Sequence, residues 1–297
     1  MTRWLVLGSG GQLGSDMVRL LQEHDEDVIG RGRSEVDITD SDAVAGAIRD
    51  SDPDVVVNAA AFTAVDRAET EEAAALAVNG TGPALIAQQV AARAGTWLVH
   101  LSTDYVFAGD SAIPYDEAAA PAPATAYGRT KLVGEQEVQR ILPDRGLIVR
   151  TAWLYGEAGT NFVTTMLRLA AGHDPVQVVT DQIGQPTWSW DLARQIRLLI
   201  AAKGPAGTYH ATNAGACSWY EFAREVFTLA GADPDRVQPT TSANFPRPAP
   251  RPAYSVLGHA GWQTIGVAAM RPWGEALAES VPLIRERAAV DPVERIS

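Results

Sequence analysis

Apolar runs alternate with helical segments along the first half of the chain, and this alternation constrains the fold more than any other feature. The runs lie at residues 4–8, 27–30, 54–61, 96–103 and 146–153. Between them, apolar residues recur at helical spacing in three segments, at 11–24, 41–50 and about 71–94. Short strands that are apolar on both faces and separated by helices form parallel sheets that are covered on both sides. The first 150 residues therefore predict a doubly wound α/β domain.

The second half of the chain is less regular and predicts a smaller, interleaved domain. Helical spacing marks residues 161–172, 189–202 and 218–231, and residues 207–213 are strand-like. The segment "FPRPAPRP" (245–252) contains too many prolines for a helix or a central strand, so it is expected to be an extended loop. We predict a first domain of residues 1–151 plus about 180–203, and a second domain of about 152–179 and 204–297.

Composition and charge exclude several classes of protein. The chain has 297 residues, a formal net charge of -12 and one cysteine, Cys217, so it can form no internal disulfide and lacks the basic footprint of a general nucleic-acid binder. The five histidines are scattered without metal-ligand spacing, and we expect no metal. The first residues lack the apolar core of a signal peptide, and no apolar run approaches the ~20 residues that cross a bilayer. We therefore expect a cytoplasmic protein without membrane partners.

A glycine-rich loop follows the first predicted strand. In "GSGGQLG" (8–14), Gly8, Gly11 and Gly14 form a G-x-x-G-x-x-G pattern around Gln12 and Leu13. Glycines at a strand–helix junction let the backbone approach a pyrophosphate closely, and the helix N-terminus supplies partial positive charge. A turn that merely tolerates glycine is the alternative. The position of the pattern at the first βα junction favours dinucleotide binding, so all five residues are predicted to bind a cofactor.

The region after the second predicted strand indicates which dinucleotide is bound. Proteins that prefer NAD usually carry an acid there, whereas "GRGRSE" (30–35) offers Arg31 and Arg33, which suit a 2′-phosphate. This favours NADPH, with NADH possible, unless both arginines point into solvent. Asp37 and Ile38 complete the expected contacts on this side, and Asp37 could accept a hydrogen bond from the adenine amino group.

The segment "AYGRTK" (126–131) places Tyr127 and Lys131 about one helical turn apart, on one face of a predicted helix. A free tyrosine titrates near ~10, and a neighbouring ammonium would lower its pKa toward neutrality. The pair could therefore be a proton-transfer device. Taken alone, it could equally be a partly buried tyrosine beside a solvated lysine.

The motifs together resemble the extended short-chain dehydrogenase/reductases and, within them, the dTDP-4-dehydrorhamnose reductase family. The glycine loop and Y-x-x-x-K are shared across the superfamily. The more specific motifs are "STDYVF" (102–107), "RTAWLYG" (150–156) and "DQIGQPT" (181–187). The resemblance covers nearly the whole chain and implies a Rossmann-like fold with a smaller substrate-binding domain.

The resemblance also implies a role for each catalytic residue. Tyr127 is expected to be the general acid that protonates the oxygen of the reduced carbonyl. Lys131 is expected to lower the pKa of this tyrosine and to bind the nicotinamide ribose, and the Thr103 hydroxyl to bond the substrate oxygen. Ala61, Phe62 and Thr63, which follow the third strand, are expected to line the cofactor.

Substrate contacts are expected from five residues: Asp104 and Trp153 at the sugar, and Asn161, Arg247 and Arg251 at the nucleotide or its phosphates. Four of them have a structural alternative, namely core packing for Trp153, a helix cap for Asn161 and solvation for the two arginines. Some members of the family are dimers bridged by a divalent ion held by glutamates. Here Asp16 and Trp190 stand near two of those positions, so we do not expect that metal, and the chain could be a monomer or a homodimer.

The implied activity is reduction of dTDP-4-dehydro-L-rhamnose to dTDP-L-rhamnose with NADPH. One alternative is a reductase or epimerase of the same superfamily that acts on another nucleotide sugar. Another is a reductase-like regulatory subunit of a methionine adenosyltransferase, which acts by binding its partner. The intact Thr103, Tyr127 and Lys131 set argues against the regulatory alternative.

Overall fold

The computed structural model describes residues 1–290 and contains a central sheet of parallel strands. The strand order is β10-β5-β4-β3-β1-β2, and every neighbouring pair is parallel. The strands are β1 (Arg3–Leu7), β2 (Asp27–Arg31), β3 (Val55–Asn58), β4 (Trp97–Thr103), β5 (Gly146–Thr151) and β10 (Gly207–His210). The order reverses between β1 and β3, and ligands of doubly wound sheets bind at such a switch point.

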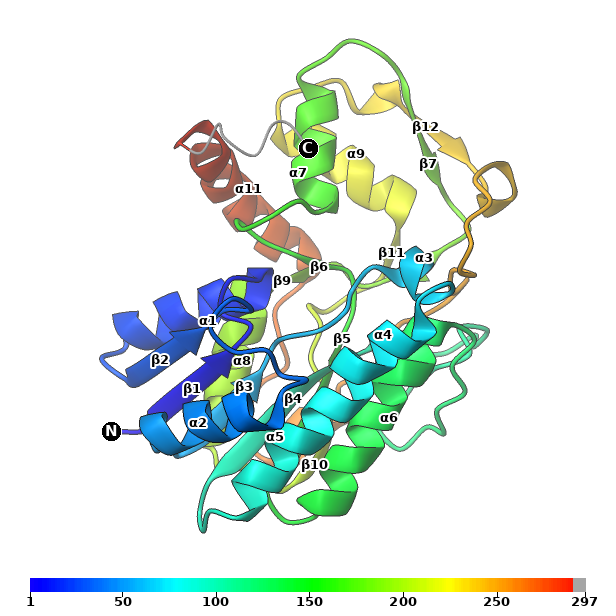
Figure 1. Cartoon of the computed structure of the whole chain (residues 1–297). Helices are drawn as coiled ribbons and strands as arrows, with labels where there is room; N and C mark the ends of the chain where they lie inside the picture. Colours follow the sequence, from blue (N-terminus) through cyan, green and yellow to red (C-terminus); the bar gives the residue numbers. More distant parts are fainter. Residues whose placement is uncertain (291–297) are drawn as a thin grey trace.

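Helices cover both faces of this sheet (Figure 1). One face packs on α1 (Gln12–Glu23) and α8 (Ser189–Ala201), and the other packs on α2 (Ser41–Ser51), α5 (Gly82–Ala91) and α6 (Ala126–Ile141). Neighbouring residues of β1 enter different cores: Trp4 and Val6 face α1 and α8, whereas Leu5 and Leu7 face the other three helices. Both faces are therefore buried, which explains the unbroken apolar runs and confirms the predicted doubly wound α/β fold.

The long helix predicted at about 71–94 is three consecutive helical segments. They are α4 (Glu72–Leu76), a π-helical turn (Ala77–Thr81) and α5. The wide turn carries Asn79, which is 1% exposed. Its side-chain amide accepts a hydrogen bond from Phe62 N at 2.8 Å and donates one to Phe62 O at 3.1 Å. π-Turns of this kind are frequent at functional sites, and this one fixes the loop that follows β3.

A second lobe lies beyond the carboxyl end of the sheet (Figure 1). Three two-stranded sheets belong to it, formed by β6 (Leu154–Tyr155) with β9 (Thr187–Trp188), β7 (Val176–Val179) with β12 (Val237–Thr240), and β8 (Ile183–Gly184) with β11 (Cys217–Ser218). Its main helices are α7 (Phe162–Ala170), α9 (Trp219–Leu229) and α11 (Trp273–Val290). The remaining short helices within residues 1–290 are α3 (Val65–Ala68), α10 (Ala260–Thr264) and turns at Asp104–Val106, Pro234–Arg236 and Ser242–Asn244. The predicted proline-rich loop at 245–252 contains neither helix nor strand.

One strand, β10, does not follow the predicted domain boundaries. β10 falls inside the range 204–297 that was assigned to the second domain, yet it pairs with β5 in the central sheet. Its residue Tyr209 packs in the same core as α1 and α8. The strand is recruited late because the chain leaves the sheet after β5, builds part of the second lobe and then returns through α8. The rest of the division stays a prediction, and residues 291–297 lie outside the described part.

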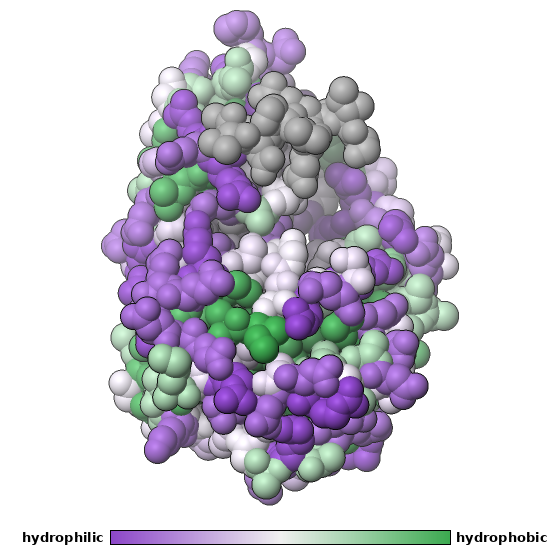
Figure 2. Space-filling model, turned by 60° about the vertical axis from the view of Figure 1, so that its left-hand side comes forward, coloured by the Kyte–Doolittle hydropathy of each residue, from purple (hydrophilic) through white to green (hydrophobic). Residues whose placement is uncertain are grey.

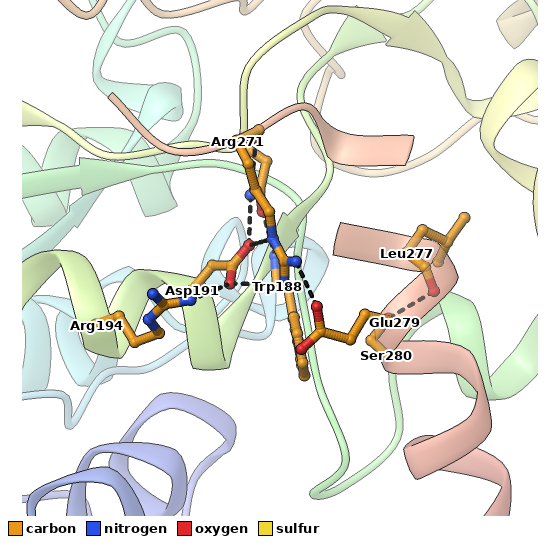
Figure 3. Close-up of polar contacts among 8 residues, drawn as sticks. Trp188, Asp191, Arg194, Arg271, Leu277, Glu279 and Ser280 are labelled. Atoms are coloured by element: carbon orange, nitrogen blue, oxygen red, sulfur yellow. Dashed lines mark hydrogen bonds and ion pairs between the residues drawn. The ribbon is translucent and has the colours of Figure 1, made fainter. Parts of the chain in front are cut away.

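An ion-pair network that is centred on the buried Asp191 joins the lobes (Figure 3). Asp191, on α8, is 5% exposed and accepts hydrogen bonds from both Nε and Nη2 of Arg271, at 2.8 and 3.0 Å. Arg271 also pairs with Glu279 on α11, and Asn213 donates to Asp191 Oδ2 at 2.8 Å. Because Asp191 and Glu279 both bind one guanidinium, α8 and α11 are held together.

The surface on the side of α1 and β2 is mainly hydrophilic, with a band of hydrophobic residues across its middle (Figure 2). Within residues 1–290, none of the helices combines the length and the apolar character needed to span a membrane.

Candidate active site

The glycine loop closes tightly against the end of β3. Gly8 has a φ of +84°, and a Cβ there would lie 2.6 Å from Ala60 N. A Cβ on Gly14 would lie 2.1 Å from Gly8 O, so neither position accepts a side chain. Gly11 caps α1, and Leu13 enters the core. The Oε1 atom of Gln12 is buried without a hydrogen-bond partner among the described residues. The result is a cradle of backbone at a helix N-terminus, which fits a pyrophosphate.

The two predicted phosphate-binding arginines differ in their surroundings. Arg31 ends β2 and forms an exposed ion pair with Glu35, at 3.3 Å, while Glu35 also accepts a hydrogen bond from Gly32 N. Arg33 is exposed and makes no hydrogen bond or ion pair within residues 1–290. The Glu35 carboxylate thus lies beside the strand end and pairs with Arg31.

The next two predicted cofactor residues point in different directions. Asp37 is exposed, and hydrogen bonds from the backbone and hydroxyl of Thr39 lower its pKa. Ile38 is 5% exposed and packs in the core beside Gly82. Its side chain is therefore a core residue, and its role at a cofactor stays a prediction.

Tyr127 and Lys131 lie on α6, as predicted, but the electrostatics of the pair differ from expectation. Lys131 is 2% exposed, and its Nζ donates to the Leu101 carbonyl at 2.5 Å. Burial lowers the pKa of Lys131 to about 8. Tyr127 keeps partial exposure, as an acid that meets a substrate must, yet burial raises its pKa to about 12 against a hydrogen bond with Thr103 that lowers it. Lys131 is not among the groups that shift this pKa, so its expected effect on Tyr127 stays a prediction.

Thr103 and Asp104 stand at the end of β4, beside the catalytic helix. Thr103 caps the short helical turn that follows, and its hydroxyl donates to Asp104 Oδ1 at 2.9 Å. Asp104 is 2% exposed, and its Oδ2 has no hydrogen-bond partner in the described part of the chain. Burial raises the pKa of Asp104 to about 6, although the hydroxyls of Ser255 and Thr103 oppose this rise. This carboxyl can therefore accept a hydrogen bond from a ligand hydroxyl.

The loop at residues 61–63 approaches the same point from β3. Asn79 binds both backbone groups of Phe62, as described above, and Phe62 and Tyr127 pack against one small cluster of alanines. Ala61 and Thr63 flank Phe62 in this loop. The predicted cofactor-lining segment thus lies beside the predicted acid.

A buried polar network that the sequence did not reveal lies beneath Lys131. Arg150 makes two hydrogen bonds to Glu135, at 2.9 and 2.7 Å, and Ser102 donates to Glu135 Oε1 at 2.5 Å. His100 lies 3.5 Å from Lys131 Nζ; burial and this cation keep the pKa of His100 well below its usual range. The sequence could have predicted this network, because the predicted buried strand "GLIVRT" contains an arginine. A buried arginine is costly unless an acidic side chain pairs with it.

Two predicted substrate residues sit at the entrance to the second lobe. Trp153 follows β5 and stacks on Trp219, with ring centroids 3.6 Å apart, so one indole face is covered. Asn161 caps α7: its Oδ1 accepts from Thr164 N at 3.0 Å and its Nδ2 donates to Gly156 O at 2.8 Å. The cap alternative for Asn161 is confirmed, and a phosphate contact stays a prediction.

The proline-rich loop brings Arg251 to the first lobe. Arg251 forms an ion pair with Asp66 of α3 at 2.8 Å, whereas Arg247 is exposed. Arg251 also lines a small cavity of about 100 Å³ with Tyr105 and Thr125, the residue that caps the catalytic helix. One of the two predicted diphosphate cations thus lies near the site, already paired with a carboxylate.

Asp16 and Trp190 enclose an arginine. Arg19 binds Asp16 at 3.1 Å and Glu157 at 2.6 Å, and its guanidinium lies over the Trp190 ring. Burial raises the pKa of Asp16 to about 6, against the hydrogen bond from Ser189. Within residues 1–290, no cluster of three or more histidine, cysteine, aspartate or glutamate side chains is arranged to hold a metal ion.

The site therefore combines a phosphate cradle at the switch point of the sheet, a tyrosine acid with a neighbouring hydroxyl, and a buried ammonium. It lies where the carboxyl ends of β1, β3 and β4 meet the second lobe. This arrangement can orient a dinucleotide and deliver a proton beside it.

Comparison with known proteins agrees with this chemistry. A dTDP-4-dehydrorhamnose reductase of Streptomyces griseus is 51% identical over 290 residues, which cover 96% of this chain and 95% of the relative. A probable dTDP-4,6-dihydroxy-2-methyloxan-3-one 4-ketoreductase of Streptomyces antibioticus is also 51% identical, over 280 residues that cover 94% of this chain and 95% of the relative. The crystal structure of dTDP-4-dehydrorhamnose reductase from Bacillus anthracis, in complex with NADP, has a TM-score of 0.91 and 38% identity, and covers 95% of this chain and 99% of that one. The family described as RmlD substrate binding domain matches residues 2–285, and the chain belongs to this family.

Proposed function

We propose that this protein reduces the C4 carbonyl of dTDP-4-dehydro-L-rhamnose to give dTDP-L-rhamnose, using NADPH. The observation that carries the proposal is the convergence of Thr103, Tyr127 and Lys131 beside a glycine cradle at the switch point of the sheet. Relatives at 51% identity that are named as reductases of dTDP-linked deoxysugars support the substrate class, and a similar structure with NADP bound supports the cofactor.

The cofactor, when bound, supplies the hydride; the chain supplies position and proton. Gly8 and Gly14 leave the space that a pyrophosphate needs, and Arg33 offers an exposed guanidinium for a 2′-phosphate. Thr103 and Tyr127 hold the carbonyl oxygen, and Tyr127 gives it a proton as the alcohol forms. With a pKa of about 12, Tyr127 keeps its proton at neutral pH until the developing alkoxide takes it.

Tyr127→Phe tests this proposal, because it removes the acid and deletes a single oxygen. We expect turnover of dTDP-4-dehydro-L-rhamnose to fall by ~10²–10⁴-fold, the usual worth of a general acid, with NADPH affinity unchanged. The measurement is NADPH oxidation under saturating nucleotide sugar, with calorimetric titration of NADPH as the control for folding. A variant that kept activity within about threefold of wild type, far outside that range, would refute the assignment.

Another dTDP-linked 4-keto-6-deoxysugar is the second candidate substrate, because equally similar relatives carry names for different sugars. Comparing kcat/KM for several such ketosugars decides between them. The regulatory-subunit alternative predicts no turnover with any of them and co-purification with an adenosyltransferase. The proposal further places the enzyme in the cytoplasm as a monomer or homodimer, and its charge of -12 opposes nucleic-acid phosphates.

A further inference from the structure

Trp153 holds a strained backbone close to the catalytic hydroxyl. Its φ is +47°, a region that side chains other than glycine rarely adopt and keep only where neighbours enforce it. It lies two residues past Thr151, which pairs with Thr103 across β5 and β4. Strained residues cluster at functional sites. The residues that hold Trp153 in this conformation are therefore relevant to the active site.

Two neighbours hold the Trp153 indole. The Trp219 ring stacks on it with an interplanar angle of 10°. Gly184 packs against it so closely that a Cβ there would lie 2.4 Å from Cε2 and 2.6 Å from Cζ2 of the indole. Any side chain at residue 184 would therefore displace the ring, which gives a physical reason for the glycine in "DQIGQPT".

The strand that carries Gly184 also reaches the carboxylate at the end of β4. Ser255 N donates to the carbonyl of Ile183, which directly precedes Gly184, at 2.9 Å. The Ser255 side chain in turn lies close enough to the Asp104 carboxyl to lower its pKa. A continuous set of contacts thus runs from the stacked indoles to Asp104, beside Thr103 and Tyr127.

The two indoles are more exposed to solvent than the second-lobe core against which they pack. Trp153 and Trp219 are both partly exposed, whereas Phe222 on the same aromatic cluster is 0% exposed. Phe162 also contacts Trp219, with ring centroids 4.5 Å apart. The stack therefore forms the solvent-facing edge of the second-lobe core, where that lobe meets the catalytic end of the sheet.

We propose that Trp219 and Gly184 are positioning residues, which fix the Trp153 indole as a wall of the deoxysugar pocket. The inference rests on the proposed function, because it takes the occupant of the pocket to be a dTDP-linked deoxysugar. It differs from simple core packing in that the stack should govern binding of the sugar nucleotide and leave binding of NADPH unchanged.

Trp219→Leu tests the inference, with Trp273→Leu as the matched control. Trp273 meets the same cluster through Phe222, with ring centroids 5.9 Å apart, and makes no ring contact with Trp153. For Trp219→Leu we expect KM for the ketosugar to rise about three- to tenfold, from the usual worth of an aromatic pair, with KM for NADPH unchanged. The exciton signal of the stacked indoles in circular dichroism should also disappear. Trp273→Leu should change neither KM nor this signal, and Trp219→Phe, which keeps a ring, should restore most of the sugar affinity.

Two results would overturn the inference. One is loss of the exciton signal in Trp219→Leu with an unchanged KM for the ketosugar. The other is an equal rise of KM in both leucine variants, which would indicate a general weakening of the second lobe. If the wild type turned over no ketosugar, the proposed function would fail instead. Affinity for dTDP-L-rhamnose would then be titrated calorimetrically, and equal affinity of wild type and Trp219→Leu would still refute the positioning role.

Discussion

Lys131→Met should change the pH dependence of stability as well as abolish activity. The wild-type ammonium is buried at 2% exposure, and its pKa falls from 10.5 to about 8. Below pH 8 the lysine is charged in both states, and the charge has a higher free energy in the folded protein than in the unfolded chain. This cost disappears as the pH rises from about 8 to 10.5, so the lysine makes wild-type stability increase with pH in that window.

The magnitude follows from the shift of the pKa. At pH 7 the buried charge costs about 3 kcal/mol, and at pH 9.5 it costs about 1 kcal/mol. Methionine removes this cost but leaves the Leu101 carbonyl without its donor, a loss of roughly 1–3 kcal/mol that does not depend on pH. At pH 7 the free energy of unfolding of the variant should thus exceed that of the wild type by about 0–2 kcal/mol. Relative to wild type, it should lose about 2 kcal/mol between pH 7 and 9.5.

Urea unfolding of both proteins at pH 7 and 9.5 measures this difference. Only the change with pH matters, because the cost of the missing hydrogen bond cancels in it. Lys131→Arg provides the control, since a guanidinium stays charged at both values and should show no such relief. A gap between wild type and Lys131→Met that stays constant with pH would mean that the ammonium is not destabilised by burial, and our account of the site would be wrong.

Two further substitutions address the cofactor and the buried network. NADPH should be preferred over NADH, and Arg33→Ala should lower the ratio of kcat/KM with NADPH to kcat/KM with NADH about tenfold or more. Arg31→Ala should lower this ratio less, because Glu35 already binds Arg31. An equal decrease of the ratio in both variants would contradict this ranking. Glu135→Gln should lower the free energy of unfolding by roughly 3–5 kcal/mol in denaturant titrations, because Arg150 would remain buried at 4% exposure without its carboxylate. A loss below about 1 kcal/mol, typical of a solvated surface pair, would mean that water reaches the guanidinium.

The regular part of the fold could be predicted because its causes are local. Apolar runs at 54–61 and 96–103 are buried on both faces, and such runs indicate parallel strands whatever follows them. The cradle was equally predictable, since Gly8, Gly11 and Gly14 recur at fixed spacing directly after the first strand. Both signals depend on a few consecutive residues, and a single sequence contains them in full.

The errors arise where distant segments meet. Nothing local to residues 207–210 shows that they join β5, more than fifty residues earlier. The burial of Tyr127 depends on how α6 packs on its neighbours, so the rise of the pKa of Tyr127 could not be predicted from spacing on one helix. The motifs identify Tyr127 as an acid, but the surroundings that tune it come from other parts of the chain.

The late arrival of β10 has a consequence for synthesis on the ribosome. Until residues 207–210 emerge, β5 is the edge of the sheet and exposes a strand of almost wholly buried residues, Gly146–Thr151. At roughly 5–20 residues per second, the 55 residues between Thr151 and Gly207 leave that edge open for several seconds. Unpaired apolar edges of this kind are templates for aggregation. The nascent chain is therefore most in need of a chaperone in that interval, when its catalytic residues are already made but its sheet is incomplete.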